Sequence, residues 1–164
     1  MAAYDLAQVN IMRLRAPLDS PELAPFVAAL DPVNALAEQA PGFVWRLKAA
    51  DGNSTSLRIF EDDSLIVNMS TWRSLEALTD YAYRSAHVDI MRRRREFAVP
   101  IAEAYIALWW VPRGHQPTIA EAEARLRHLR AHGPTAHAFG VRTPFPAPNA
   151  TAAPKVRDDD ACWG

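Results

Sequence analysis

LIVNMSTWRSLEALTDYAYRSAHVDIMRRRREF, residues 65–97, predicts a strand that runs directly into a long helix. Along a strand, successive side chains point to opposite faces of the sheet. Leu65, Val67 and Met69 therefore share one face, which is apolar and suits a covering layer of helices. The opposite face mixes apolar bulk with hydrogen-bonding groups, which suits the wall of a pocket. Its residues are Ile66, Asn68, Ser70 and Trp72.

The helix after this strand is predicted to begin behind Ser74, a residue type that caps helix N-termini. Its second half places a phenol, an imidazole and a guanidinium on one face among apolar side chains. These residues follow one another at steps of four, three, four and three: Tyr83, His87, Ile90, Arg94 and Phe97. Because the apolar members of this row are stabilised by burial, we expect the polar members to be drawn inward with them.

Residues 4–12 predict another strand with the same division of its faces. Ala7, Val9 and Ile11 form an apolar face, whereas Gln8 and Asn10 place amides on the opposite one. A helix is predicted from Ser20 to Pro41, with a kink or restart at Pro32. Strands are predicted over 43–48 and 105–111, the second of them buried, and a short strand is possible over 55–60. A last helix is predicted to begin with a capping box at Thr118 and Glu121 and to stop at Gly133.

This order of elements predicts an α+β fold of the ferredoxin-like, split βαβ type with an antiparallel sheet and an extra C-terminal helix. We expect residues 1–140 to form this domain. Residues 141–164 are rich in Ala and Pro and are expected to form an extended tail. In this interpretation no helix is left to cover the sheet face that carries the amides, so a homodimer is expected to bury it.

Composition narrows the class of protein. The 164 residues are enough for one domain with a core, and the net charge of −1 gives no footprint for nucleic acid or an anionic membrane. A single cysteine, Cys162, favours a reducing compartment, and we find no signal peptide or membrane-spanning run, so a cytoplasmic location is expected. No metal signature is present, because His128 and His132 share a helix face without an evident third ligand.

Three segments, APGFVWR (40–46), VNMSTWRSLEAL (67–78) and YRSAH (83–87), carry a resemblance to the dimeric α/β-barrel superfamily. The chain is most similar to a family still described as a domain of unknown function, from Tyr4 to about Gly140. More distantly it resembles antibiotic-biosynthesis monooxygenases and small heme-degrading enzymes. The resemblance implies two sheets packed face to face across a dimer, with a pocket in each subunit between sheet and helices.

The heme-degrading branch of that superfamily implies a site built from an Asn, a Trp and a heme-ligating His. Asn10 matches the Asn and His87 stands near the His, but Tyr81 occupies the position of the Trp. The interval from Tyr81 to His87 is also shorter than in that branch. We therefore expect no cofactor, with heme as the alternative.

These observations predict a homodimeric protein that binds a small apolar or aromatic molecule. If it is an enzyme, a cofactor-independent monooxygenase, cyclase or isomerase of specialised or catabolic metabolism is expected. The predicted catalytic residues are His87 as acid/base, with Arg94 and Tyr83 stabilising an anion. The predicted substrate-binding residues are Asn10, Asn68, Trp72, Trp45, Tyr81, Gln8 and Ile90.

Each assignment has a structural alternative. His87 can be a hydrogen-bonded structural histidine, and Arg94 can be one of four solvated arginines in a row. The tryptophans can be core residues, and the amides can satisfy one another across a dimer. A heme protein and a non-catalytic ligand-binding dimer therefore remain alternatives to an enzyme.

Overall fold

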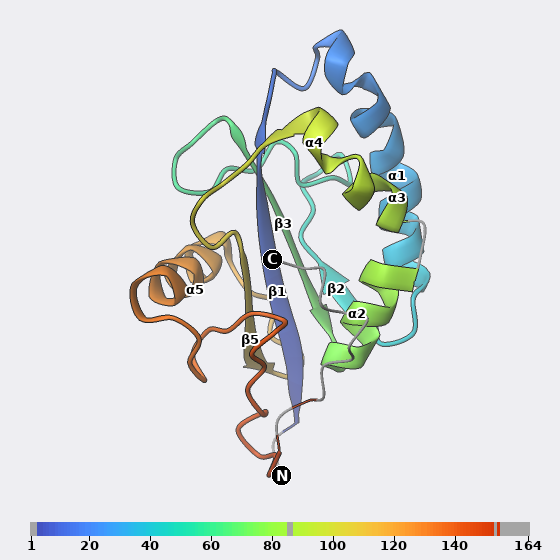
Figure 1. Ribbon diagram of the computed structural model, residues 1–164. Coiled ribbons are helices and arrows are strands. Elements are labelled where there is room, and N and C mark those ends of the chain that lie inside the picture. Colours follow the sequence, from blue (N-terminus) through green and yellow to red (C-terminus); the bar gives the residue numbers. More distant parts are fainter. Residues whose placement is uncertain (1–2, 85–86, 153, 155–164) are drawn as a thin grey trace.

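A computed structural model describes residues 3–84, 87–152 and 154, except for the side chains of Arg84, His87 and Ile90. Its strands are β1 (Tyr4–Leu14), β2 (Phe43–Arg46), β3 (Leu65–Trp72), β4 (Ala98–Val99) and β5 (Ile106–Pro112). Its helices are the 3-10 helix η1 (Pro21–Leu23), α1 (Ala24–Gln39), α2 (Leu75–Arg84), α3 (His87–Arg92), α4 (Arg94–Phe97) and α5 (Ile119–His132). The strands form one sheet with helices on both sides, as Figure 1 shows.

The sheet is antiparallel, and β1 lies at its centre. One edge of β1 pairs with β3, which pairs in turn with β2. The other edge pairs with β5 over residues 4–10 and with β4 over residues 13–14. The order β2-β3-β1-β5 with helical crossovers is the ferredoxin-like arrangement, so the predicted fold class is confirmed.

One face of the sheet is apolar and is covered by α5 (Figure 1). Ala122, Leu126 and Leu129 of α5 pack on it and are buried. From the sheet, β1 and β3 contribute the apolar residues that alternation grouped on this face: Ala7, Val9, Ile11, Leu65, Val67 and Met69. β5 adds Ala107, Trp109 and Val111. The helical layer predicted over this face is therefore present, and the C-terminal helix supplies it.

The opposite face, which carries the amides, is covered by α1 to α4 (Figure 1). Leu75 and Leu78 of α2 pack against Leu6 and Trp72, while Phe26 of α1 packs with Ile66 and Phe97. The expectation that no helix covers this face is wrong. Because both faces are covered within the chain, the uncovered surface that motivated the homodimer is not there, and the dimer itself stays a prediction.

Local signals explain the starts of α2 and α5. Thr118 and Glu121 form the predicted capping box, and Ser74 accepts a hydrogen bond from the backbone N–H of Ala77 at 3.1 Å. Pro32 lies inside α1, which continues through it as one helix. Residues 55–60 contain no strand, and the expected long helix is described as the three segments α2, α3 and α4.

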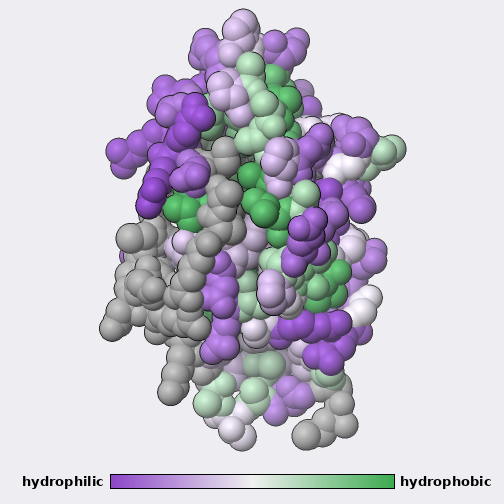
Figure 2. Space-filling view, turned by 90° about the vertical axis from the view of Figure 1, so that its right-hand side faces the viewer, coloured by the Kyte–Doolittle hydropathy of each residue, from purple (hydrophilic) through white to green (hydrophobic). Residues whose placement is uncertain are grey.

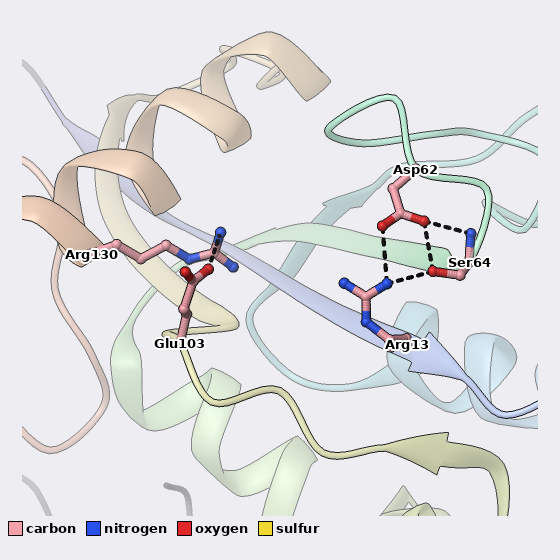
Figure 3. Close-up of polar contacts among 5 residues, drawn as sticks. All are labelled: Arg13, Asp62, Ser64, Glu103 and Arg130. Atoms are coloured by element: carbon pink, nitrogen blue, oxygen red, sulfur yellow. Dashed lines mark hydrogen bonds and ion pairs between the residues drawn. The ribbon is translucent and has the colours of Figure 1, made fainter.

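Polar contacts hold the loops before β3 and β5 against β1 and α5, as Figure 3 shows. The guanidinium of Arg13 on β1 contacts Asp62 at 3.0 Å and Ser64 at 2.6 Å, which fixes the approach to β3. Arg130 of α5 pairs with Glu103, ahead of β5, at 3.0 Å. Each pair joins segments far apart in the sequence.

Residues beyond 140 also contact the domain. Val141 is buried, and the indole N–H of Trp110 donates to the carbonyl of Phe145 at 2.9 Å. The ring of Phe145 lies 5.8 Å from that of Phe139, which is fully buried. The first residues of the expected tail therefore pack on the sheet, whereas the boundary at residue 140 as a limit of folding stays a prediction.

Candidate functional site

A cavity of about 110 Å³ lies between the face of the sheet that carries the amides and the helices α1, α3 and α4. Its floor is formed by β1 and β3, and a wall is formed by the loop that follows β2. The described residues lining it are Asn10, Met12, Phe26, Ala29, Leu30, Val33, Asn34, Asn53, Ser54, Thr55, Ile66, Asn68, Met91, Arg94 and Phe97. Eight of these residues are apolar and seven are polar or charged, so the cavity combines apolar walls with several hydrogen-bonding groups that could orient a small molecule.

Asn68 is the exposed residue of β3, and every other residue of that strand is buried. It lies directly opposite Asn10 in the pairing of β1 with β3, so two amides meet on the cavity floor. The buried Gln8 donates from Nε2 to Oδ1 of Asn68 at 3.0 Å and to Oγ of Ser70 at 2.9 Å. Because its oxygen is held in this way, Asn68 can offer its N–H groups to a ligand.

Arg94 is the charged residue among the described residues that line the cavity. Its Nη2 donates to the backbone carbonyl of Ile11 at 3.2 Å, and its guanidinium stacks on Tyr105 at 4.5 Å from the ring centre. Burial lowers the pKa of this guanidinium, although Tyr105 acts in the opposite direction. In the described part of the chain no carboxylate lies within ion-pair distance of Arg94, so most of its five N–H donors are available to an anion.

The neighbouring arginines behave differently. Arg92, Arg93 and Arg95 are exposed. Arg92 lies 3.9 Å from Asp89, and Arg93 forms a 2.9 Å ion pair with Glu96. The run of four arginines therefore turns one guanidinium inward, as the helical row predicted, and leaves three on the surface.

Two of the predicted binding residues, Trp72 and Tyr81, lie beside the cavity rather than in it. Their rings stack at 5.2 Å, and the edge of Phe43 meets Trp72 at 5.5 Å. The phenol of Tyr81 donates to the carbonyl of Val33 at 3.2 Å, and burial raises its pKa to about 12. Gln8 likewise does not line the cavity, but it orients Asn68, which does.

The remaining predicted residues divide into two groups. Trp45 packs on the apolar face under α5, which puts it across the sheet from the cavity. Tyr83 is half-buried and is not among the described lining residues. The side chains of His87 and Ile90 lie outside the described part of the structure, although both residues belong to α3.

Sequence reasoning missed a polar wall of this cavity. Asn34 of α1 donates to the side-chain oxygen of Asn53 at 2.8 Å, and Ser54 donates to the carbonyl of Val67 at 2.7 Å. Thr55 completes this wall. The sequence suggested only a possible short strand over 55–60, and polar composition alone gave no sign that this segment folds over β3.

The cavity volume and the histidines elsewhere in the fold bear on the expected absence of a cofactor, which stays a prediction. Small-molecule and cofactor pockets usually enclose roughly 300–1,000 Å³, so this cavity of about 110 Å³ is by itself small for a heme. The rings of His132 and His137 lie 4.5 and 4.6 Å from that of His128, which adds a third imidazole to the expected pair. Even so, no group of His, Cys, Asp or Glu in the described chain is arranged to hold a metal ion.

Residues 5–155 match the model of a family described as a domain of unknown function, DUF3291. The chain belongs to this family. The expected membership in a family of unknown function is therefore confirmed, and the match extends past residue 140. Comparison of this DUF3291 chain with curated proteins gave no match. None of its described helices is both long and apolar enough to cross a membrane.

Several solved structures are similar to this DUF3291 protein at low identity. SnoaB, described as a cofactor-independent oxygenase from Streptomyces nogalater, is 18% identical, with a TM-score of 0.48 over 71% of this chain and 100% of its own. PA3566 from Pseudomonas aeruginosa is 13% identical, with a TM-score of 0.46 over 70% and 99%. Rv0793 from Mycobacterium tuberculosis is 15% identical, with a TM-score of 0.43 over 70% and 99%.

Proposed function

We propose that this protein binds a small, largely apolar anion, a carboxylate or a phenolate, in the cavity between the sheet and α1, α3 and α4. The observation that carries the proposal is Arg94, a half-buried guanidinium at the cavity with no ion-pair partner among the described carboxylates. A buried charge without a partner is unfavourable, so a ligand anion is its natural complement.

The rest of the cavity supports the same class of ligand. Asn68 offers N–H donors from the floor, and Phe26, Phe97 and Leu30 supply apolar walls. The cavity of about 110 Å³ is smaller than the apolar cavity of about 150 Å³ that holds a benzene molecule, so we propose that it takes the charged head of the ligand and part of its first ring.

We further propose that the site acts on this ligand without a cofactor, by oxygenation, cyclisation or isomerisation. Arg94 and Asn68 are donors that would stabilise negative charge developing on a ligand oxygen. The described lining residues include no carboxylate, histidine, cysteine or lysine for proton transfer. The base proposed for this chemistry is His87, at the start of α3, because the sequence places it on the same helical row as Arg94.

Calorimetric titration with benzoate tests the binding proposal. Benzoate should bind the native protein, and Arg94→Gln should weaken it at least tenfold, because a charge-assisted hydrogen bond contributes roughly 1.5–3 kcal/mol. Arg95→Gln is the matched control, since Arg95 is exposed and does not line the cavity. Equal loss in both variants, or unchanged binding in Arg94→Gln, would rule out the cavity as the anion site.

The catalytic part of the proposal has its own readout. His87→Gln should leave benzoate affinity unchanged within about twofold while abolishing turnover of any substrate found in an aerobic screen of aromatic acids and phenols. Full turnover by His87→Gln would remove His87 from the mechanism. Ligand binding without turnover of any screened compound would favour a non-catalytic binding protein.

A further inference from the structure

A second hollow adjoins the cavity on the same side of the sheet. It encloses about 590 Å³, and it is lined by the end of β1 with the segment after it and by the loop before β3. The lining residues are Leu14, Arg15, Ala16, Pro17, Leu18, Asp19, Thr55, Arg58, Asp63, Ser64, Leu65 and Ile66. We call this hollow the groove. Thr55 and Ile66 line both the groove and the cavity, so the two spaces share a wall.

The register of the strands places the two spaces one after the other. Asn10 pairs with Asn68 on the cavity floor, and Met12 pairs with Ile66 at the shared wall. The backbone N–H of Leu14 then donates to the carbonyl of Ser64 in the groove. Four residues of strand separate Asn68 from Ser64, which corresponds to about 13 Å. A ligand that spans both spaces is therefore longer than a single ring.

The charges of the two spaces differ. The cavity has Arg94 as the charge among its described lining residues, which attracts an anion. The groove has two arginines, Arg15 and Arg58, and two aspartates, Asp19 and Asp63, of which Arg58 and Asp63 form a 3.2 Å ion pair. Its formal charges balance, and the rest of its lining is mostly aliphatic. The groove therefore suits an uncharged, apolar extension.

The walls of the groove are held in place by contacts from elsewhere in the fold. Ser64 is bound by Arg13 and Asp62, as Figure 3 shows. The loop between Thr55 and Ser64 is fixed to α5, because Glu123 accepts a 2.6 Å hydrogen bond from the backbone N–H of Phe60. Ordered walls of this kind favour a preformed subsite.

We infer that the ligand is an elongated aromatic or aliphatic acid whose anion meets Arg94 in the cavity and whose uncharged extension lies in the groove. This inference rests on the proposed function, and it adds a second subsite that selects the ligand by length. Each methylene transferred from water to an apolar surface contributes about 0.8 kcal/mol, or roughly fourfold in affinity, so partial burial of a second ring should be measurable.

The test compares benzoate with biphenyl-4-carboxylate by calorimetry on the full chain. The dissociation constant of the longer acid should be lower than that of benzoate by about tenfold or more. Leu18→Trp fills the groove. It should lower the affinity of the longer acid to that of benzoate and leave the affinity of benzoate unchanged. Pro17→Trp is a second groove variant at an exposed position, which guards against misfolding of the first. Val27→Trp is the matched control, since Val27 is 41% exposed on α1 and lines neither space.

The outcomes separate the two proposals. If both acids bind with the same affinity, or if the gain for the longer acid persists in both groove variants, the groove is not a subsite and the cavity proposal stands. If neither acid binds, or if Arg94→Gln binds both as well as the native protein does, the proposed function fails and the length selection fails with it. Loss of the gain in Val27→Trp would also overturn the assignment to the groove.

Discussion

Tyr81 shows how burial changes the chemistry of one residue. Its ring stacks on Trp72, its hydroxyl donates to Val33, and its pKa is raised to about 12 because burial penalises the phenolate. In the unfolded chain it returns to the ordinary value near 10. The unfolded state therefore loses this proton at a lower pH than the folded state does.

A prediction about stability at alkaline pH follows from Tyr81. The contribution of Tyr81 is fully present below pH 10 and is lost as the pH rises toward 12, by on the order of 2 kcal/mol. Urea unfolding across this range should show the native protein losing more stability than Tyr81→Phe, which has no proton to lose. Parallel slopes for the two proteins would show that the phenol is not buried as described.

Single residues also show what the sequence could and could not predict about the site. Alternation along β1 and β3 placed Asn10 and Asn68 on one face, and helical spacing turned Arg94 inward; all three line the cavity. The same alternation put Trp72 on that face. Its position beside the cavity, under α2, depends on packing with Phe43 and Tyr81. Packing of this kind depends on residues far apart in the sequence, which local pattern does not encode.

At the scale of elements, the sequence predicted β1, β2, β3 and β5 in their order but not β4, and it left the face that carries the amides without a helix. The face that carries the amides lies under α1 to α4, and these helices leave Asn68 exposed at the centre of a buried strand. Figure 2 looks onto this side, where hydrophobic residues lie among hydrophilic ones. Val27 and Leu36 of α1 are exposed hydrophobic residues. The polar residues on this strand face therefore indicated a cavity beneath the helices, and not a face without helices.

The join between α1 and β2 provides a prediction at this scale. Gly42 has φ of +82°, and a Cβ there would lie 2.5 Å from Cβ of Ala77 on α2. Gly42→Ala should therefore cost roughly 2–4 kcal/mol, from backbone strain together with this steric conflict.

A matched pair of variants separates the two causes. Gly52→Ala has a similar φ of +88° with nothing within 4 Å, so it should show the cost of strain alone. Adding Ala77→Gly to Gly42→Ala should recover part of the loss. The readout is the free energy of unfolding in urea; equal costs at both glycines would argue against close packing of α2 on this turn.

At the scale of the whole molecule, the chain covers its own sheet on both faces (Figure 1). The predicted homodimer had been argued from an uncovered face, and that argument no longer applies. Sedimentation at micromolar concentration decides the matter. A monomer would agree with the coverage described here, and a dimer would have to form through another surface.

The extent of the folding unit gives the last prediction. A chain ending at Gly140 loses the buried Val141 and the contacts of Phe145 with Trp110 and Phe139. It should be less stable by on the order of 2–5 kcal/mol than a chain ending at Ala152, because each buried apolar side chain contributes roughly 1.5–3 kcal/mol. Urea unfolding of both chains tests this, and equal stability would place the boundary at 140 as first expected.

β5 and β4 pair with the same edge of β1, at residues 4–10 and 13–14. Arg94 donates its hydrogen bond to the carbonyl of Ile11, which lies between these two paired stretches. That carbonyl belongs to the same peptide group as the amide nitrogen of Met12, a residue that lines the cavity. An anion that engages the guanidinium changes the polarisation of this peptide group. The ¹⁵N resonance of Met12 is thus an intrinsic sensor of occupancy, which allows ligands to be screened by NMR without a label on the ligand or knowledge of the reaction.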